Sequence, residues 1–256
     1  MARSTRKERQ MGTMTGRGLG SRRRTPKTVA AGSSTTSLTA SASGTARVGP
    51  ILLLPSVLAE LGVTPRRAFG KAGVDPRSFK SPDNRLPYAD LGRLLSVCAT
   101  LTNCGHFGLL VGQRFTLEDF GAIGYLMRNS VTVGEALREF LLHFYRYDRV
   151  GAPVLLSLEP SNVMLGYSVH RHDMPATRQA YDTAIAIGHR LLRDLCGESW
   201  KPLQVQFAYR RPKDIASYCR CFGATVRCDA EVSGLVFAAS WLEHRIAGAD
   251  PEGSPH

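Results

Sequence analysis

The stretch 151–170, GAPVLLSLEPSNVMLGYSVH, decides the fold class that this sequence predicts. Two runs of mainly apolar residues, 152–159 and 162–170, flank Pro160 and Ser161, which is the pattern of a β-hairpin. Upstream of residue 151 the apolar residues recur at helical spacing, and here that period stops. The sequence therefore predicts that an antiparallel sheet begins at this hairpin.

Downstream of the hairpin, the sequence predicts one long helix and several short strands. The segment 177–197, TRQAYDTAIAIGHRLLRDLCG, has apolar residues at helical spacing and ends in glycine, a typical residue just beyond a helix C-terminus. LQVQFAY, 203–209, alternates strictly and puts Leu203 and Phe207 on one side of a strand and two glutamines on the other. ATVRCDAEVSGLVFAA, 224–239, predicts two more short strands joined by a polar turn.

Upstream of the hairpin, helical patterns predominate. The segment 132–149, TVGEALREFLLHFYRYDR, begins with the pattern of a capping box. In this motif the side chains of Thr132 and Glu135 each accept a hydrogen bond from the backbone N–H of the other residue. Short helices are predicted near 51–61 and 65–72. A DNA-binding helix-turn-helix is the alternative for this pair. We favour two helices that pack on a larger body, because the second offers few polar groups suited to base contacts.

Glycines divide the middle of the helical half. Gly108 and Gly112 interrupt the apolar run 106–115, and Gly121 and Gly124 permit close packing of the next short helix. The order of elements is helices, hairpin, helix and strands. This order predicts an α+β fold, in which a helical N-terminal half packs on a small antiparallel sheet as a single domain.

Charge separates a basic tail from a nearly balanced remainder. Of the net charge of +12 on 256 residues, residues 1–47 carry +9, with ten of the 33 Lys and Arg residues and one of the 21 acidic residues. These residues include almost no large apolar side chains, so we expect a disordered basic tail over 1–47. Alternatives are a start codon assigned too early, a non-specific polyanion contact and an organellar transit peptide.

No established catalytic motif occurs in the sequence. We find no GxGxxG after a strand, no P-loop, no GxSxG and no HExxH, so we expect neither enzyme activity nor a cofactor. No apolar run approaches the ~18 residues of a membrane span, so we expect no membrane contact. Six cysteines without a signal peptide indicate reduced thiols in a cytoplasmic protein.

Cys219, Cys221 and Cys228 form the pattern closest to a metal site. Structural zinc sites usually show two closely spaced ligand pairs, whereas a fourth ligand here would have to be a remote histidine, such as His189 or His244. We therefore predict no metal site and interpret these cysteines as core residues. Thiol sensing is the remaining alternative.

Aromatic, basic and imidazole groups gather at the end of the 132–149 segment. One interpretation is an ordinary amphipathic surface, in which His143 pairs with Glu139 one turn earlier. The other is the wall of a small-molecule cavity, where a basic residue would suit a carboxylate ligand. The candidate ligand-binding residues of the second interpretation are Tyr125, Arg128, His143, Arg146, Tyr167 and Tyr181.

A family resemblance is carried by five segments between residues 51 and 241. They are LLPSVLAELGVTPRRAFGKAGVD, LPYADLGRLLSVCATLTNCGHFGLLVGQRF, FGAIGYLMRNSVTVGEALREF, AYDTAIAIGHRLLRDLCG and FAYRRPKDIASYCRCFGATVRCDAEVSGLVF. In this order they resemble the arabinose-binding-like N-terminal sensor domain of AraC/XylS-type bacterial transcription regulators. The family tends to have aromatic residues where Cys221 and Cys228 stand, which supports core packing at those positions.

The resemblance implies a ligand-binding and dimerisation domain over 48–245, with a small-molecule effector such as an amino acid, sugar or fatty acid, and a homodimer as its assembly. In the family, a C-terminal domain with two helix-turn-helix motifs binds promoter DNA. This sequence stops at His256, so we interpret 246–256 as a linker stub and expect promoter DNA to be bound only through an absent domain. The alternative is a stand-alone small-molecule-binding protein, or a dominant-negative dimerisation partner without DNA binding.

Overall fold

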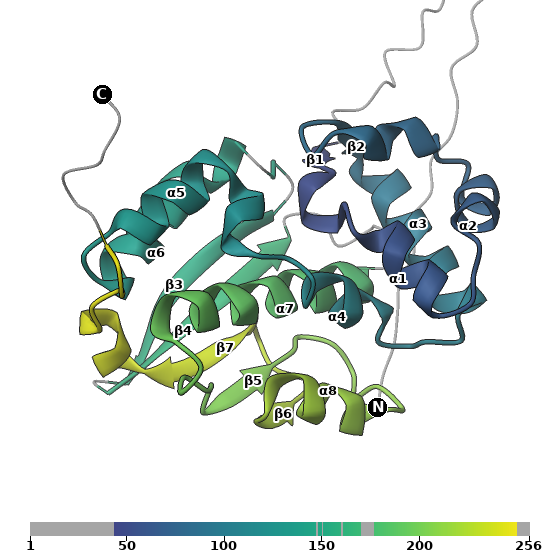
Figure 1. The fold of residues 1–256 in the computed structure, drawn as a ribbon. Helices are drawn as coiled ribbons and strands as arrows, with labels where there is room; N and C mark the ends of the chain where they lie inside the picture. Colours follow the sequence, from purple (N-terminus) through teal and green to yellow (C-terminus); the bar gives the residue numbers. More distant parts are fainter. Residues whose placement is uncertain (1–43, 147, 150, 160, 170–176, 250–256) are drawn as a thin grey trace, which may run out of the picture. The chain divides into compact units, whose positions relative to one another are not determined.

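The computed structural model describes residues 44–249 except 147, 150, 160 and 170–176 (Figure 1). The α-helices are α1 (Leu54–Glu60), α2 (Pro65–Ala72), α3 (Tyr88–Leu101), α4 (Phe107–Gly112), α5 (Ala122–Asn129), α6 (Val133–His143), α7 (Thr177–Cys196) and α8 (Ile215–Phe222). The strands are β1 (Thr45–Arg47), β2 (Arg85–Pro87), β3 (Gly151–Glu159), β4 (Asn162–Val169), β5 (Gln204–Gln206), β6 (Thr225–Arg227) and β7 (Ser233–Ala238). Short 3-10 helices are η1 (Gly49–Ile51), η2 (Pro76–Lys80), η3 (Leu117–Phe120), η4 (Phe144–Arg146) and η5 (Ala239–Glu243).

The larger sheet confirms the α+β prediction. β3 and β4 form the predicted hairpin, with Leu155 opposite Leu165, and β4 pairs antiparallel with β7. The strand order is β3-β4-β7-β5-β6, in which β5 and β6 form a parallel pair. Although β6 and β7 follow each other in sequence, β5 lies between them. A second, two-stranded sheet pairs β1 with β2.

Helix α7 crosses the larger sheet and contacts β4 and β7 (Figure 1). Its predicted apolar face is confirmed, because Ile185 and Leu192 are buried toward the sheet. Gly188 keeps the helix close to the strands: a Cβ atom added there would lie 3.3 Å from a methyl group of Leu235. The sheet therefore acquires its hydrophobic cover from a helix that follows the hairpin directly in sequence.

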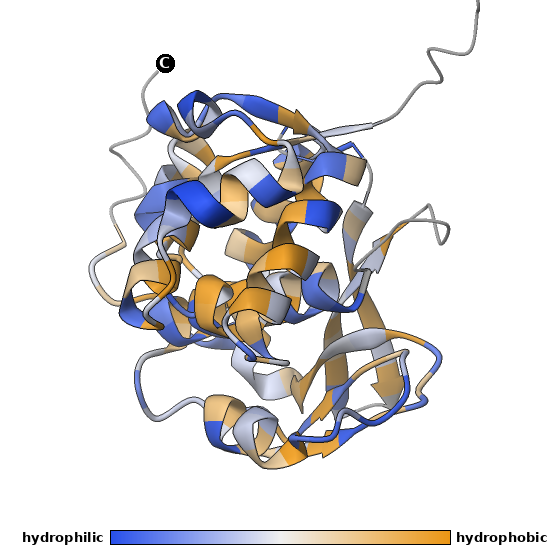
Figure 2. Ribbon diagram, turned by 90° about the vertical axis from the view of Figure 1, so that its right-hand side faces the viewer, coloured by the Kyte–Doolittle hydropathy of each residue, from blue (hydrophilic) through white to orange (hydrophobic). Residues whose placement is uncertain are grey.

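The buried apolar side chains form two hydrophobic clusters. The first joins α5, α6 and α7 to the larger sheet, and it includes Trp200 and Phe237. The second joins α1, α2 and α3 to β1 and β2, and it includes Leu54 and Leu94. Tyr167 packs against both clusters. Figure 2 shows apolar residues concentrated on the inward faces of the helices and strands. Among the described residues, no helix is both long and apolar enough to span a membrane.

The glycines of α4 form a helix contact and do not interrupt the helix, which corrects the sequence-based prediction. A Cβ atom at Gly108 would lie 2.3 Å from the carbonyl oxygen of Gln179, and one at Gly112 would lie 2.4 Å from that of Thr183. Glycine thus lets the backbones of α4 and α7 approach closely. The predicted close packing around Gly124 is confirmed, since a Cβ atom there would lie 1.9 Å from the carbonyl oxygen of Leu117.

Helix α6 starts as predicted but ends earlier. The Thr132 hydroxyl accepts a hydrogen bond from the Glu135 N–H at 3.2 Å, whereas the Glu135 carboxylate accepts from the Val131 N–H at 3.0 Å. The bond to the Thr132 hydroxyl is the one that a capping box requires. The Glu135 carboxylate bonds to the N–H of Val131, one residue before Thr132. The α-helix ends at His143 and continues as the 3-10 helix η4, so the predicted helix over 132–149 is too long.

Three predicted boundaries and positions need correction. Residues 45–47 form β1 and do not belong to a disordered tail; the rest of the predicted tail, 1–43, lies outside the described residues. Ile246 is buried and its N–H donates to the Val131 carbonyl at 3.1 Å, so the packed part extends beyond residue 245. Leu203, which precedes β5, is 57% exposed, whereas Phe207, which follows β5, is buried as predicted.

Candidate functional site

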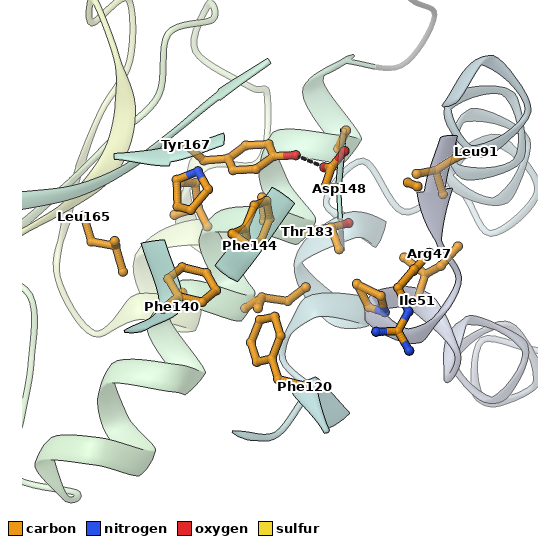
Figure 3. A pocket seen from close by; sticks show the side chains of 18 of the residues that line it. Arg47, Ile51, Leu91, Phe120, Phe140, Phe144, Asp148, Leu165, Tyr167 and Thr183 are labelled. Carbon is orange, nitrogen blue, oxygen red and sulfur yellow. Dashed lines mark hydrogen bonds between the residues drawn. The ribbon is translucent and has the colours of Figure 1, made fainter. Parts of the chain in front are cut away.

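A cavity of about 100 Å3 lies between the two hydrophobic clusters (Figure 3). Its walls come from both halves of the described unit: β1, η1 and α3 on one side, and α6, η4, β4 and α7 on the other. No single stretch of sequence contains this site. The fold creates it by bringing an N-terminal strand against a helix and a strand that lie about a hundred residues later.

Most of the cavity wall is apolar. Phe140 stands between Phe120 and Phe144 in edge-to-face contacts, with ring centroids 5.3 and 5.1 Å apart. Leu165 of β4 and Ile51 of η1 close the wall further along (Figure 3). A mainly apolar concavity with a few polar groups is typical of small-molecule sites.

Asp148 and Tyr167 supply a half-buried polar pair at one end of the cavity (Figure 3). The Tyr167 hydroxyl donates to the Asp148 carboxylate, which also accepts from the Gly151 N–H at 3.3 Å. Burial, and then the negative charge of Asp148, raise the pKa of Tyr167. The lack of a side chain at Gly151 admits the ring, since a Cβ atom there would lie 2.3 Å from the Tyr167 hydroxyl oxygen.

Other polar side chains of the cavity wall come from three different elements. Arg47 of β1 forms an ion pair with Asp83. Thr183 of α7 donates its hydroxyl proton to the Gln179 carbonyl at 2.9 Å. Tyr88 of α3 is 3% exposed, and its hydroxyl has no hydrogen-bond partner among the described residues. Buried polar groups are nearly always paired, so the Tyr88 hydroxyl marks this cavity as a place for a further polar atom.

The structure brings only part of the predicted site together. Tyr167 lines the cavity, and Tyr181 packs behind it with ring centroids 6.2 Å apart, so these two predicted residues belong to the same region. The Tyr181 hydroxyl accepts a hydrogen bond from the Val169 N–H at 3.3 Å. That Tyr167 and Tyr181 bind a ligand stays a prediction.

The other four predicted residues do not line this cavity. Tyr125 is 46% exposed on α5, and Arg128 forms an ion pair with Glu118. His143 pairs with Glu139 at 3.4 Å, which is the amphipathic-surface interpretation. Arg146 of η4 is exposed. His143 lies outside the cavity because α6 turns its apolar face, with Phe140, toward the cavity and its polar face outward.

Arg47, Tyr88 and Asp148 were not among the predicted residues. Arg47 lay in the part interpreted as a tail, and Tyr88 stood in a segment quoted only for the family resemblance. Asp148 stood inside the quoted 132–149 segment, but nothing in the sequence paired it with Tyr167. No local pattern distinguishes these side chains, because their proximity arises from contacts between distant elements.

A second buried polar cluster lies on another side of α7. Asp182 is fully buried, and its carboxylate accepts hydrogen bonds from the hydroxyl groups of Tyr209 and Tyr218, the latter at 2.8 Å. Burial raises the pKa of Asp182 to about 7, although both hydroxyl groups act in the opposite direction. This cluster does not line the cavity and joins α7 to α8 and to the loop after β5.

The three cysteines of the C-terminal region are half-buried free thiols. Burial raises the pKa of Cys221 to about 12, so its thiol stays protonated at neutral pH. Within the residues that the structure describes, no group of three or more metal-binding side chains occurs.

Protein purified without a chelator is therefore expected to contain less than stoichiometric zinc, because a protonated thiol is a poor metal ligand. Elemental mass spectrometry measures this directly. One zinc ion per chain that disappears in the Cys221→Ser variant would contradict the prediction.

Comparisons with known proteins match part of the chain to transcription regulators. A family model described as the arabinose-binding domain of AraC transcription regulators, N-terminal, matches residues 62–246. The ornithine utilization regulator of Pseudomonas aeruginosa is 27% identical over 210 residues. This match covers 81% of the present chain and 62% of that regulator, so the chain spans about three-fifths of the length of this relative.

A solved structure shares the fold. The crystal structure of the transcriptional regulator CdpR from Pseudomonas aeruginosa aligns with a TM-score of 0.53 and 20% sequence identity. The alignment covers 72% of the present chain and 56% of that chain.

Proposed function

Since this chain belongs to the AraC transcription regulators with an arabinose-binding-like N-terminal domain, we propose that it binds a small-molecule effector and dimerises as the sensor part of a cytoplasmic regulator. The effector site is the cavity between the two hydrophobic clusters. We propose no catalytic role, and the relatives named above are regulators.

The observation that carries this proposal is the origin of the cavity wall. Ile51 and Tyr88 come from the N-terminal helical cluster, whereas Phe144 and Tyr167 come from the part of the chain around the sheet. A molecule bound there contacts both clusters at once and favours the arrangement that holds them together. Binding energy that differs between two arrangements is what allows an effector to shift a regulator between states.

Dimerisation is supported by one edge of the larger sheet. β3 forms one edge of this sheet, and its Leu156 and Leu158 are exposed. Edge strands with exposed apolar side chains readily pair with another chain. Sequence-specific DNA binding would require a segment beyond the sensor domain, as in the longer relatives, because specific recognition needs side chains that reach base edges.

A cavity-filling variant tests the effector site. Ala184 of α7 lines the cavity, so Ala184→Leu is expected to occupy part of it with a side chain that suits a helix. Any compound from a panel of amino acids, including L-ornithine, sugars and short fatty acids that raises the melting temperature of the wild type should lose that effect in Ala184→Leu.

The matched control is Ala122→Leu, on the exposed first turn of α5, which should keep the ligand response. Melting temperature without ligand identifies a variant that merely fails to fold. A compound that raises the melting temperatures of Ala184→Leu and Ala122→Leu equally would mean that the effector site lies elsewhere. Sedimentation equilibrium on the same samples measures dimerisation.

A further inference from the structure

The Tyr88 hydroxyl is the buried polar group of the cavity wall whose hydrogen-bonding capacity is unmet among the described residues. Asp148 already accepts from Tyr167, and Arg47 is paired with Asp83. Thr183 is bonded to a main-chain carbonyl. As far as the structure describes the chain, the wall therefore presents one donor without an acceptor, the Tyr88 hydroxyl, in a mainly apolar lining.

The protonation state of Tyr88 keeps it a donor. Burial, followed by the nearby charge of Asp148, raises the pKa of Tyr88, so the hydroxyl remains protonated at every physiological pH. A buried donor that lacks an acceptor costs free energy, and that cost is recovered when a ligand supplies the acceptor.

We propose that this cavity selects a small apolar molecule carrying one acceptor oxygen, which receives the hydrogen bond of the Tyr88 hydroxyl. The inference rests on the proposed effector site and specifies its ligand class. A cavity of about 100 Å3 holds a ring or short chain of roughly six heavy atoms without rearrangement. A zwitterionic amino acid fits poorly, because both charged side chains of the wall already have partners and a buried unpaired charge is costly.

Three small probes of similar size distinguish a ligand with one acceptor oxygen from an apolar ligand and from a zwitterion. Cyclopentanone carries one acceptor oxygen, methylenecyclopentane has nearly the same shape without it, and L-proline is a zwitterion on a five-membered ring. Titrations followed by protein NMR chemical shifts give a dissociation constant for each probe. We expect wild-type protein to bind cyclopentanone about fivefold or more tightly than methylenecyclopentane, and to bind L-proline weakest.

The Tyr88→Phe variant removes only the hydroxyl and should bind the first two probes equally. Tyr125→Phe, at an exposed tyrosine outside the cavity, should keep the wild-type preference. Thermal unfolding of both variants shows that they fold, and Tyr88→Phe should be at least as stable as the wild type.

A cyclopentanone preference that persists in Tyr88→Phe would refute the role of the hydroxyl. L-proline binding as tight as cyclopentanone binding, or no binding by any probe, would refute the ligand class. Either result would refute the proposed ligand chemistry without showing that the cavity is not the effector site. A compound of another class that binds the wild type and loses its effect in Ala184→Leu would uphold the site while excluding the chemistry proposed for it.

Discussion

Replacing Gly108 by alanine is expected to destabilise the protein by about 3 kcal/mol, the upper part of the usual range for overpacking a core. The added Cβ atom would lie 2.3 Å from the Gln179 carbonyl oxygen and 3.0 Å from the Cβ atom of Asp182. The first contact is with backbone of α7, so no side-chain rotation relieves it and the helices must separate. Separation also strains the hydrogen bond from the Gly108 N–H to the Gln179 side chain, which is 2.7 Å long.

Gly70→Ala is the matched control for this prediction. Gly70 lies in α2, is exposed, and would place a Cβ atom with nothing within 4 Å. Both variants lower the entropy of the unfolded chain equally, so their difference reports the clash in the folded state. Gly70→Ala should stabilise by up to about 1 kcal/mol, since alanine favours helix.

Urea unfolding followed by circular dichroism measures both changes. Equal stabilities of Gly108→Ala and Gly70→Ala would show that α4 and α7 do not pack through this glycine.

Asp182 is expected to make the stability of the protein fall as the pH rises from about 4 to about 7. An unfolded aspartate has a pKa of 3.8, and burial raises the pKa of Asp182 to about 7 in the folded protein. The folded state therefore holds this proton more tightly than the unfolded state. Stability that depends on the protonated carboxyl is complete below pH 4 and is lost as the pH rises through 7, by an amount of the order of 4 kcal/mol.

Wild-type data alone do not isolate this effect. Burial lowers the pKa of His189 to about 4, so His189 makes stability rise with pH over nearly the same range. The Asp182→Asn variant removes the carboxyl titration, and asparagine can still hydrogen-bond to Tyr209 and Tyr218. The free energy of unfolding of the wild type minus that of Asp182→Asn should therefore decrease between pH 4 and pH 8.

Asp214→Asn supplies a control of opposite sign. Hydrogen bonds from Ser217 lower the pKa of Asp214, which caps α8, below the unfolded value of 3.8, so the corresponding difference should increase as the pH rises toward that value. Urea titrations at each pH give both curves. A flat curve for Asp182→Asn would mean that the carboxyl is accessible to solvent in the folded protein.

The sequence by itself determined the fold class and most of its elements. Two apolar runs that flank Pro160 and Ser161 predicted the hairpin of β3 and β4, and apolar spacing predicted α7 with its buried face. These features depend on residues close together in the chain, whose periodicity reflects the geometry of a helix or strand. Leu203 shows the limit of this reasoning, because the strand pattern in the sequence begins one residue before the strand that forms.

The position of the cavity and the residues that line it were decided only by the tertiary structure. Tyr167 was predicted as a site residue, but its partner Asp148 and the Tyr88 hydroxyl, which lacks a partner within the described part of the chain, come together only because α3, β4 and the segment after η4 meet. Tyr125, Arg128, His143 and Arg146 had suitable chemistry, yet the packing of α5, α6 and η4 places them outside the cavity. Local periodicity predicts which face of a helix is buried. The residues that this face contacts depend on packing between segments far apart in sequence.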